Sequence, residues 1–180
     1  MADEIKTMHR SAIKLIDKYF SDKVDAGGHQ YVGHMNRIED EIIKEKKLKC
    51  SDPHSTLSIF YDKAAIVALL HDIIEDTECT EDILRVNGFD EEIIEAVVAI
   101  TRRKDEQYYF DFIERVSKND IAKLVKIYDL QDNMDIKRLK KFEEYEQKRL
   151  KKYWYCWKYL RGEISSLQCN NVIHPDRKFR

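Results

Sequence analysis

The chain has 180 residues, which is enough for one domain with a sizeable core. Hydrophobic residues make up 43% and charged residues 37%, with only five glycines and two prolines, which is typical of a helical protein and excludes collagen-like and disordered chains. The 32 basic and 34 acidic residues are interspersed and give a formal net charge of -2, so the overall charge favours binding neither to nucleic acid nor to an anionic membrane.

Two further features bear on where the protein works. The amino terminus lacks the basic-then-apolar layout of a secretory signal, and no apolar run approaches the roughly 18 to 20 residues that span a bilayer. The four cysteines are scattered without a Cys-x-x-Cys pair, so neither a zinc knuckle nor a disulfide framework is indicated. We expect a cytoplasmic protein with reduced thiols and no membrane partner.

We predict a single all-α domain, because apolar residues recur at helical spacing along the chain. The first half should contain, in chain order, a helix over residues 5–21, a break at 25–28, a helix over 34–49, a turn at 51–54 and a helix over 57–73. The last of these is apolar almost all round, which marks it as the buried central helix.

The second half should contain five helices and a tail. They are a short helix between Thr80 and Gly88, helices over 90–100, 109–116 and 121–134, and a long charged helix over 135–160. We expect the long helix to pack outside the site. Residues 161–180 are expected to form a peripheral loop or frayed tail rather than a second domain.

The most informative segment is the end of the predicted central helix. There an apolar run gives way to His71, Asp72, Glu75 and Asp76 within six residues. Burying several ionisable groups is costly unless a cation or a substrate compensates them. A second polar cluster, residues 129–134, closes the helix predicted over 121–134. We interpret the first cluster as the floor of an active site.

Four side chains form a candidate metal site. His34, His71, Asp72 and Asp129 each lie at a predicted helix end flanked by core residues, so a helical bundle can bring them together. Two imidazoles and two carboxylates suit a divalent ion such as Mn²⁺, Fe²⁺, Zn²⁺ or Mg²⁺. Such an ion lowers the pKa of bound water and offsets phosphate charge, which is useful for hydrolysis of a phosphate ester.

The acidic pair Glu75 and Asp76 is the candidate for proton transfer. If the central helix continues past Asp72, both carboxylates border the same cavity as His71 and can position or deprotonate water. Acidic residues are disfavoured at a helix C-terminus by the helix dipole, so their placement there favours a function.

Three segments together resemble the HD phosphohydrolase superfamily. They are Tyr31-Val32-Gly33-His34, then His71-Asp72 with Glu75-Asp76-Thr77, and then Lys126-Ile127-Tyr128-Asp129 with Asn133-Met134. More narrowly, the chain resembles the alarmone hydrolase domain of the RelA/SpoT-homologue family, including its small stand-alone hydrolases, over roughly residues 5–139.

This resemblance implies an HD-domain helical bundle over residues 1–160 and a reaction that removes pyrophosphate from the 3′ position of the nucleotide (p)ppGpp, leaving GDP or GTP. It implies that His34, His71, Asp72 and Asp129 hold Mn²⁺. Glu75 and Asp76 would activate the attacking water, and Asn133 would touch the substrate near its sugar or phosphate.

Basic residues are the remaining candidates for substrate binding. Lys126 and Arg102 are candidates for steadying the departing charge, and Arg102, Arg103 and Lys104 form a corner that can grip phosphate. Lys23 lies near the loop that precedes His34.

The chain departs from the family in this loop. Family members usually place a basic pair and a serine there, whereas this chain has Asp25-Ala26-Gly27-Gly28-His29. Another nucleotide therefore remains open as the substrate of an HD-type phosphatase. A non-catalytic nucleotide-binding module is a further alternative, although such a protein would be expected to have lost a ligand or the acidic pair. The sequence also leaves a homo-oligomer open.

Overall fold

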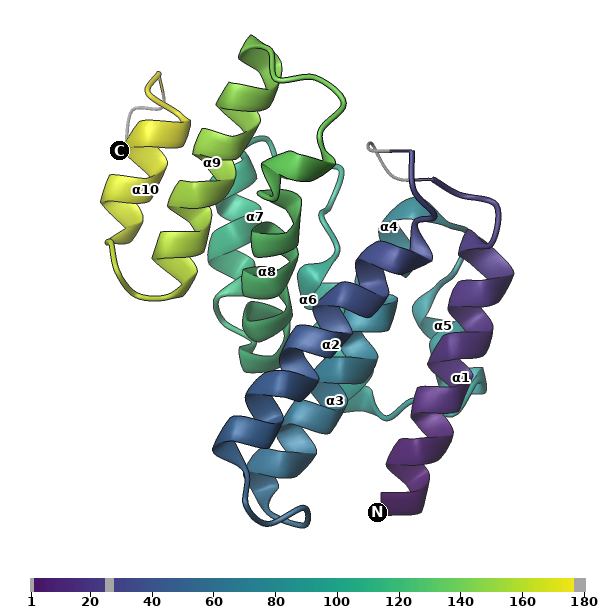
Figure 1. The fold of residues 1–180 in the computed structure, drawn as a ribbon. Helices are drawn as coiled ribbons and strands as arrows, with labels where there is room; N and C mark the ends of the chain where they lie inside the picture. Colours follow the sequence, from purple (N-terminus) through teal and green to yellow (C-terminus); the bar gives the residue numbers. More distant parts are fainter. Residues whose placement is uncertain (1, 25–27, 177–180) are drawn as a thin grey trace.

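The computed structural model describes residues 2–24 and 28–176. Over this part of the chain the protein is helical and contains no β-strand, which confirms the predicted all-α class (Figure 1). The helices are, in chain order, α1 (Ala2–Phe20), α2 (Val32–Lys49), α3 (Thr56–Leu70), α4 (Ile73–Asp76), α5 (Glu81–Val86), α6 (Glu91–Ile100), α7 (Tyr109–Val116), α8 (Asp120–Asn133), the 3-10 helix η1 (Ile136–Arg138), α9 (Glu144–Leu160) and α10 (Ser166–Ile173). The break predicted at residues 25–28 falls mainly on residues 25–27, which lie outside the described residues.

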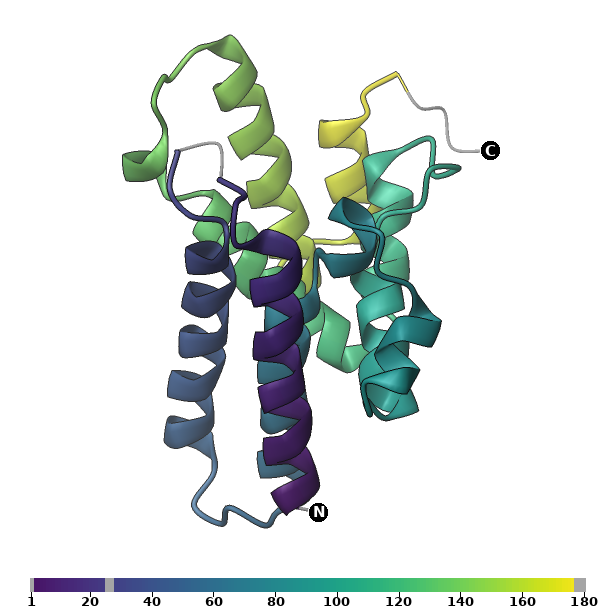
Figure 2. The same ribbon diagram turned by 90° about the vertical axis from the view of Figure 1, so that its right-hand side faces the viewer.

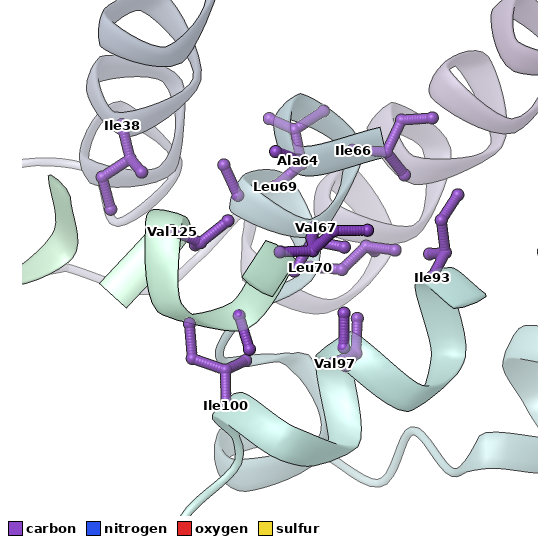
Figure 3. Close-up of a cluster of buried hydrophobic side chains, with 14 of the residues drawn as sticks. Ile38, Ala64, Ile66, Val67, Leu69, Leu70, Ile93, Val97, Ile100 and Val125 are labelled. Atoms are coloured by element: carbon purple, nitrogen blue, oxygen red, sulfur yellow. The ribbon is translucent and has the colours of Figure 1, made fainter. Parts of the chain in front are cut away.

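Helix α3 is the centre of the fold, as its apolar sequence predicts. It packs against α1, α2, α6 and α8. The side chains from Ala64 to Leu70 are all buried. Figure 3 shows several of them among apolar side chains of the neighbouring helices, namely Ile38 of α2, Ile93, Val97 and Ile100 of α6, and Val125 of α8. Burying side chains of this size contributes roughly 1.5–3 kcal/mol each relative to exposure, so α3 is held firmly in place.

The helices on either side of α3 form two groups. Helices α1 and α2 run alongside α3, while α8 separates α3 from α9, and α10 lies outermost against α9 and α7 (Figures 1 and 2). The buried apolar side chains form one cluster, from Met8 in α1 to Cys169 in α10. One shared core therefore joins the two groups. In the described part of the chain, no helix combines the length and apolar content that a membrane crossing requires.

Side-chain caps begin several helices where the sequence predicts them. The Thr80 hydroxyl accepts a hydrogen bond from the Ile83 N–H, and Gly88 follows α5 with a φ of 86°. Asp90 and Asn119 likewise accept from the N–H three residues later and begin α6 and α8. These caps satisfy N–H groups that have no partner within their own helix.

The central helix ends three residues earlier than predicted. Helix α3 stops at Leu70, and His71 and Asp72 form a turn before the single-turn helix α4 begins at Ile73. The His71 side chain itself helps to end the helix, because its Nδ1 donates to the Ala68 carbonyl oxygen at 2.7 Å. The helix predicted over 57–73 therefore gives way to a turn before the acidic pair, which lies on α4.

The long helix predicted over 135–160 is also divided. The chain forms η1, an extended stretch over residues 139–143, and only then α9. The Asp135 side chain accepts from the Lys137 N–H, which favours a turn over continued helix. Glu146 accepts from the Glu143 N–H at 3.0 Å, one half of a capping box that begins a new helix.

The prediction of a loop or frayed tail over 161–180 is wrong for residues 166–173. They form α10, in which Cys169 and Asn170 are fully buried. The Ser165 hydroxyl caps this helix by accepting from the Gln168 N–H. An eight-residue helix carries too short a periodic pattern to stand out in the sequence, and its burial depends on α7 and α9. Residues 177–180 lie outside the described residues.

Candidate functional site

Three adjacent helices bring distant polar residues together. His34 lies in the first turn of α2, His71 directly follows α3, and Asp129 lies in the last turn of α8. Because α2, α3 and α8 pack against one another, these ends meet at one place. The three residues are 1–4% exposed, so their polar atoms depend on one another rather than on solvent.

The hydrogen bond of His71 settles which ring nitrogen is free. Its Nδ1 lies 2.7 Å from the Ala68 carbonyl oxygen, which can only accept, so Nδ1 carries the proton. Its Nε2 then faces Asp72 Oδ2 at 2.9 Å and Asp129 Oδ1 at 3.8 Å. Although Asp72 Oδ2 lies this close, no hydrogen bond of good geometry satisfies the buried Nε2 among the described residues. Such an atom calls for an explanation, and a bound cation is one.

In His34 too, one ring nitrogen contacts a supporting group and the other faces Asp129, but the supporting group is a side chain. Its Nδ1 lies 2.6 Å from Asp132 Oδ2, and its Nε2 lies 3.1 Å from Asp129 Oδ1. The centres of the two imidazole rings are 5.2 Å apart. Both histidines therefore direct Nε2 toward the same carboxylate oxygen.

The donor atoms fit a divalent metal ion. His34, His71 and Asp72 each offer a ligand atom, and these three atoms lie within 4.8 Å of one another. Asp129 adds a second carboxylate beside both Nε2 atoms. Two imidazole nitrogens with carboxylate oxygens suit Mn²⁺, Fe²⁺ or Zn²⁺. We refer to His34, His71, Asp72 and Asp129 as the metal wall.

Asp129 is held in its ionised form by its neighbours. Its Oδ2 lies 2.8 Å from Lys126 Nζ, and its Oδ1 accepts from Asn133 Nδ2 at 2.6 Å. Burial alone would raise the pKa of Asp129, but Lys126 and the two histidines outweigh this effect and hold the pKa well below its usual range. The structure thus pairs Lys126 and Asn133 with a carboxylate of the metal wall.

His34 is protonated readily without a cation. Burial would lower its pKa, but hydrogen bonds to Asp129 and Asp132 outweigh burial and raise the pKa of His34 to about 9. A divalent ion that binds Nε2 takes the place of this proton, so binding is accompanied by proton release.

The acidic pair lies beside the metal wall. Glu75 Oε2 accepts from the Arg102 N–H at 2.9 Å. The Tyr31 hydroxyl lies 2.5 Å from Asp72 Oδ2 and 3.3 Å from Asp76 Oδ2. Burial, followed by the charge of Asp72, raises the pKa of Asp76, and burial with the Asp72 and Asp76 charges raises the pKa of Glu75. Raised carboxyl pKa values favour proton acceptance near neutral pH.

His34, Asp72 and Asp129 of the metal wall and the acidic pair border a cavity of about 370 Å³, while the buried His71 lies behind this lining. This volume is within the usual range for small-molecule sites, about 300–1,000 Å³. In the described part of the chain, five cationic side chains line it, namely Arg102, Lys126, Arg138, Arg149 and Lys152. Lys126 and Arg138 are paired with Asp129 and Asp132 respectively.

The other three cations make no ion pair with an acid of the described residues. We refer to Arg102, Arg149 and Lys152 as the cationic wall. Arg149 Nε is buried and has no hydrogen-bond partner in the part of the chain that the structure describes. Burial, together with the charges of Arg102 and Arg149, lowers the pKa of Lys152. Cations that gather without a counter-charge favour an anionic ligand in the cavity.

Helix α9 therefore does not pack outside the site as predicted. It supplies Arg149, Lys152 and Tyr153 to the cavity lining. These residues occupy positions 149, 152 and 153, a spacing that places them on one helical face. Arg149 and Lys152 stand in a generally basic stretch of sequence, so neither residue type was conspicuous there. The spacing of the charges was the available signal.

Only some of the residues predicted to bind substrate line the cavity. Arg102, Lys126 and Asn133 line the cavity, whereas Arg103 and Lys104 are not among its lining residues. Lys23 is also outside the lining, and its Nζ donates to the Asp76 carbonyl oxygen. Lys23 thus supports the backbone of the acidic pair. Tyr31 and Arg138 line the cavity without having been singled out as substrate-binding residues.

Comparison with protein-family models finds no matching family, and comparison with curated proteins finds no matching sequence. The resemblance to the HD phosphohydrolases therefore depends on the motif residues given above. The chemistry available to the site follows from its donor atoms, its acidic pair and its cations.

Proposed function

We propose that the protein is a metal-dependent phosphohydrolase that acts on a nucleotide, with removal of the 3′-pyrophosphate of (p)ppGpp as the first candidate reaction. The observation that carries this proposal is the convergence of the His34 and His71 Nε2 atoms on Asp129, which lines the same cavity as three cations that have no acidic partner among the described residues. A metal site alone is compatible with many proteins. A metal site facing unpaired cations favours an anionic substrate such as a phosphate ester.

Each side chain has a role that follows from its position. The residues that would hold the ion are His34, His71, Asp72 and Asp129. When bound, a divalent ion supplies charge that offsets phosphate and lowers the pKa of water. Asn133 and Lys126 keep Asp129 ionised and oriented. These contacts hold the ligand atoms of Asp129 in position before substrate binds.

The acidic pair is suited to handle the proton of the attacking water. Glu75 and Asp76 line the cavity, and their raised pKa values favour uptake of that proton. Arg102 fixes Glu75 through its backbone N–H, and its guanidinium group uses only Nη2 on the Glu106 carbonyl oxygen, so further N–H donors remain for a ligand. Arg149 and Lys152 add donors for the oxygens of the pyrophosphoryl group, which stabilises the charge that develops as water attacks its phosphorus and the bond to the ribose 3′ oxygen breaks.

The direct test is an assay of purified protein with ppGpp and Mn²⁺ that measures released pyrophosphate. We expect release by the wild type, loss of release and of Mn²⁺ binding in Asp72→Ala, and loss of release with retained Mn²⁺ binding in Glu75→Gln. Equal activity in the wild type and in Asp72→Ala excludes the mechanism. Tight nucleotide binding without turnover by the wild type instead identifies a non-catalytic nucleotide-binding module.

A second candidate is an HD-type phosphatase that acts on another nucleotide. It is favoured by the loop over residues 25–29, which lacks the basic pair and serine that family members usually place there. A panel of nucleotides assayed for phosphate and pyrophosphate release separates the two candidates. Release of phosphate from a nucleotide without a 3′-pyrophosphate, in the absence of ppGpp turnover, supports the second.

A further inference from the structure

Asp132 joins several groups directly behind the metal wall. It lies in α8, three residues after Asp129, and its side chain is 12% exposed. Its Oδ2 lies 2.6 Å from His34 Nδ1, and its Oδ1 accepts from Arg37 Nε at 2.7 Å. Arg138 Nη1 also donates to Oδ2. One carboxylate therefore holds a histidine and two guanidinium groups.

The contact with His34 has a defined direction. Because an ionised carboxylate can only accept, His34 Nδ1 must be the donor in this hydrogen bond. Its Nε2 is then the nitrogen that faces Asp129. The hydrogen bond thus selects which ring nitrogen is available to a cation, and it also fixes the plane of the ring.

Two arginines keep Asp132 in the form that this contact requires. Arg37 lies one turn after His34 on α2, and Arg138 belongs to η1, so the carboxylate is reached from two separate elements. Arg37 Nε donates to Oδ1 and Arg138 Nη1 donates to Oδ2, so each oxygen of the carboxylate accepts from a guanidinium group. A mostly buried carboxylate paired with two such cations remains charged.

The two histidines of the metal wall are oriented by different means. The partner of His71 Nδ1 is the backbone carbonyl of Ala68, which no side-chain substitution removes. The partner of His34 Nδ1 is the Asp132 side chain. The orientation of His34 therefore depends on one replaceable carboxylate.

We propose that Asp132 is a positioning residue of the metal centre, which holds His34 in its Nδ1–H tautomer with Nε2 directed at the cation and is itself fixed by Arg37 and Arg138. The proposal rests on the proposed function to the extent that it requires the metal wall to bind a divalent ion. Outer carboxylates that accept from a ligating histidine typically change metal affinity about 10- to 100-fold when removed.

The test measures Mn²⁺ binding without substrate, through the electron paramagnetic resonance signal of free Mn²⁺ during titration of the purified chain. Asp132→Ala is expected to weaken Mn²⁺ binding roughly 10- to 100-fold, and Asp132→Asn, which keeps the shape of the side chain, roughly tenfold. Asp120→Asn is the matched control, because Asp120 is an exposed acid in the first turn of the same helix. It removes the same charge and should leave the Mn²⁺ Kd unchanged.

A second readout separates positioning from a general structural role. In Zn²⁺-loaded protein labelled with ¹⁵N-histidine, the wild type should show His34 with a protonated Nδ1 and a coordinated Nε2. In Asp132→Ala the Nδ1–H signal of His34 should weaken or divide between tautomers, while the His71 signal stays unchanged. Circular dichroism establishes that each variant is folded.

The outcomes distinguish the two proposals. If the wild type does not bind Mn²⁺, the metal centre and the proposed function both fail. If the wild type binds Mn²⁺ and Asp132→Ala binds it with the same Kd, the metal centre stands and the positioning role is overturned. If Asp132→Ala does not fold, Asp132→Leu provides this decision, because leucine is similar in size to aspartate and cannot accept the hydrogen bond from His34.

Discussion

The two walls of the cavity are held in place in different ways. On the metal wall, each side chain has a hydrogen-bonded partner: Ala68 for His71, Asp132 for His34, Asn133 for Asp129 and Tyr31 for Asp72. These residues lie at the ends of helices that pack around the buried α3. Ligand atoms supported in this way keep their positions before a cation arrives.

On the cationic wall, aromatic rings provide the support. Arg102 lies 5.5 Å and Lys152 Nζ 4.4 Å from the ring centre of Tyr109, and Arg149 lies 5.7 Å from that of Tyr153. A ring face attracts a cation without using up its N–H donors. The metal wall is therefore ordered by hydrogen bonds, whereas the cationic wall keeps most of its N–H donors available for an anion.

The largest effect should follow from removing a ligand of the metal wall. His71→Ala is expected to reduce Mn²⁺ affinity by more than the roughly 10- to 100-fold that loss of an outer partner costs, and to remove hydrolysis with it. His54→Ala is the control, because His54 is exposed in the turn between α2 and α3. Titration with Mn²⁺ measures both variants. An unchanged Kd in His71→Ala would contradict the assignment of the metal wall.

The next largest effect, on the free energy of unfolding, should follow from a substitution in the core beneath the metal wall. Leu69 is fully buried two residues before His71, so Leu69→Ala should lower the free energy of unfolding by about 2–5 kcal/mol. Leu48→Ala, at a position that is 87% exposed, should change it by no more than about 0.5 kcal/mol. Urea unfolding followed by circular dichroism measures the difference. Similar midpoints for the two variants would argue against α3 as the centre of the core.

Removing a cation of the cationic wall should lower the turnover of substrate without changing the affinity for the metal ion. Arg149→Gln is expected to lower kcat/KM about 10- to 100-fold, because a hydrogen bond to a charged group is worth about 1.5–3 kcal/mol. Its Mn²⁺ Kd should stay the same, since Arg149 belongs to α9, whereas the metal wall is carried by the ends of α2, α3 and α8. Lys148→Gln is the control, because the neighbouring Lys148 is exposed and pairs with Glu144. A loss of Mn²⁺ affinity in Arg149→Gln would show that the two walls are not separate.

The smallest expected effect is on the pH dependence of the free energy of unfolding. It comes from a pair of side chains where α1 meets α2, outside both walls. The hydrogen bond to Glu39 is the main cause that raises the pKa of His9 in the folded protein. The protonated pair stabilises the fold fully below the unfolded-state pKa of about 6.5, and this contribution is lost as pH rises through the folded-state pKa. Because His9 is 35% exposed, the change should not exceed about 1 kcal/mol.

Unfolding free energies measured between pH 6 and 9 in the wild type and in His9→Gln test this prediction. The variant should lack the part of the pH dependence that the wild type shows above the unfolded-state pKa of His9. Parallel curves for the two proteins would mean that the pair with Glu39 contributes nothing to stability.

Several features of this protein could be predicted from local sequence. The apolar run over residues 64–70 indicated the buried central helix, and Thr80, Asp90 and Asn119 indicated where helices begin. These signals extend over one or two helical turns, so neighbouring residues suffice to define them. The polar groups that end α3 and α8 were also conspicuous, because charged residues rarely follow a fully apolar helix without a partner.

The breaks in longer predicted helices were harder to predict. The turn at His71 and Asp72 depends on the bond of the histidine ring to the Ala68 carbonyl, and the interruption before α9 depends on the Asp135 side chain. Each is a competition between a side chain and the helix for the same backbone groups. Periodicity alone does not predict which one prevails.

The sequence by itself determined the helical class, the central apolar helix and the types of side chain available for chemistry. Only the tertiary structure decided that Asp132 stands behind His34, that Lys126 and Asn133 hold Asp129, and that α9 turns cations into the cavity. The reason is physical: helix formation follows from residues three or four apart, whereas the partner of a buried charge is set by which helices pack together.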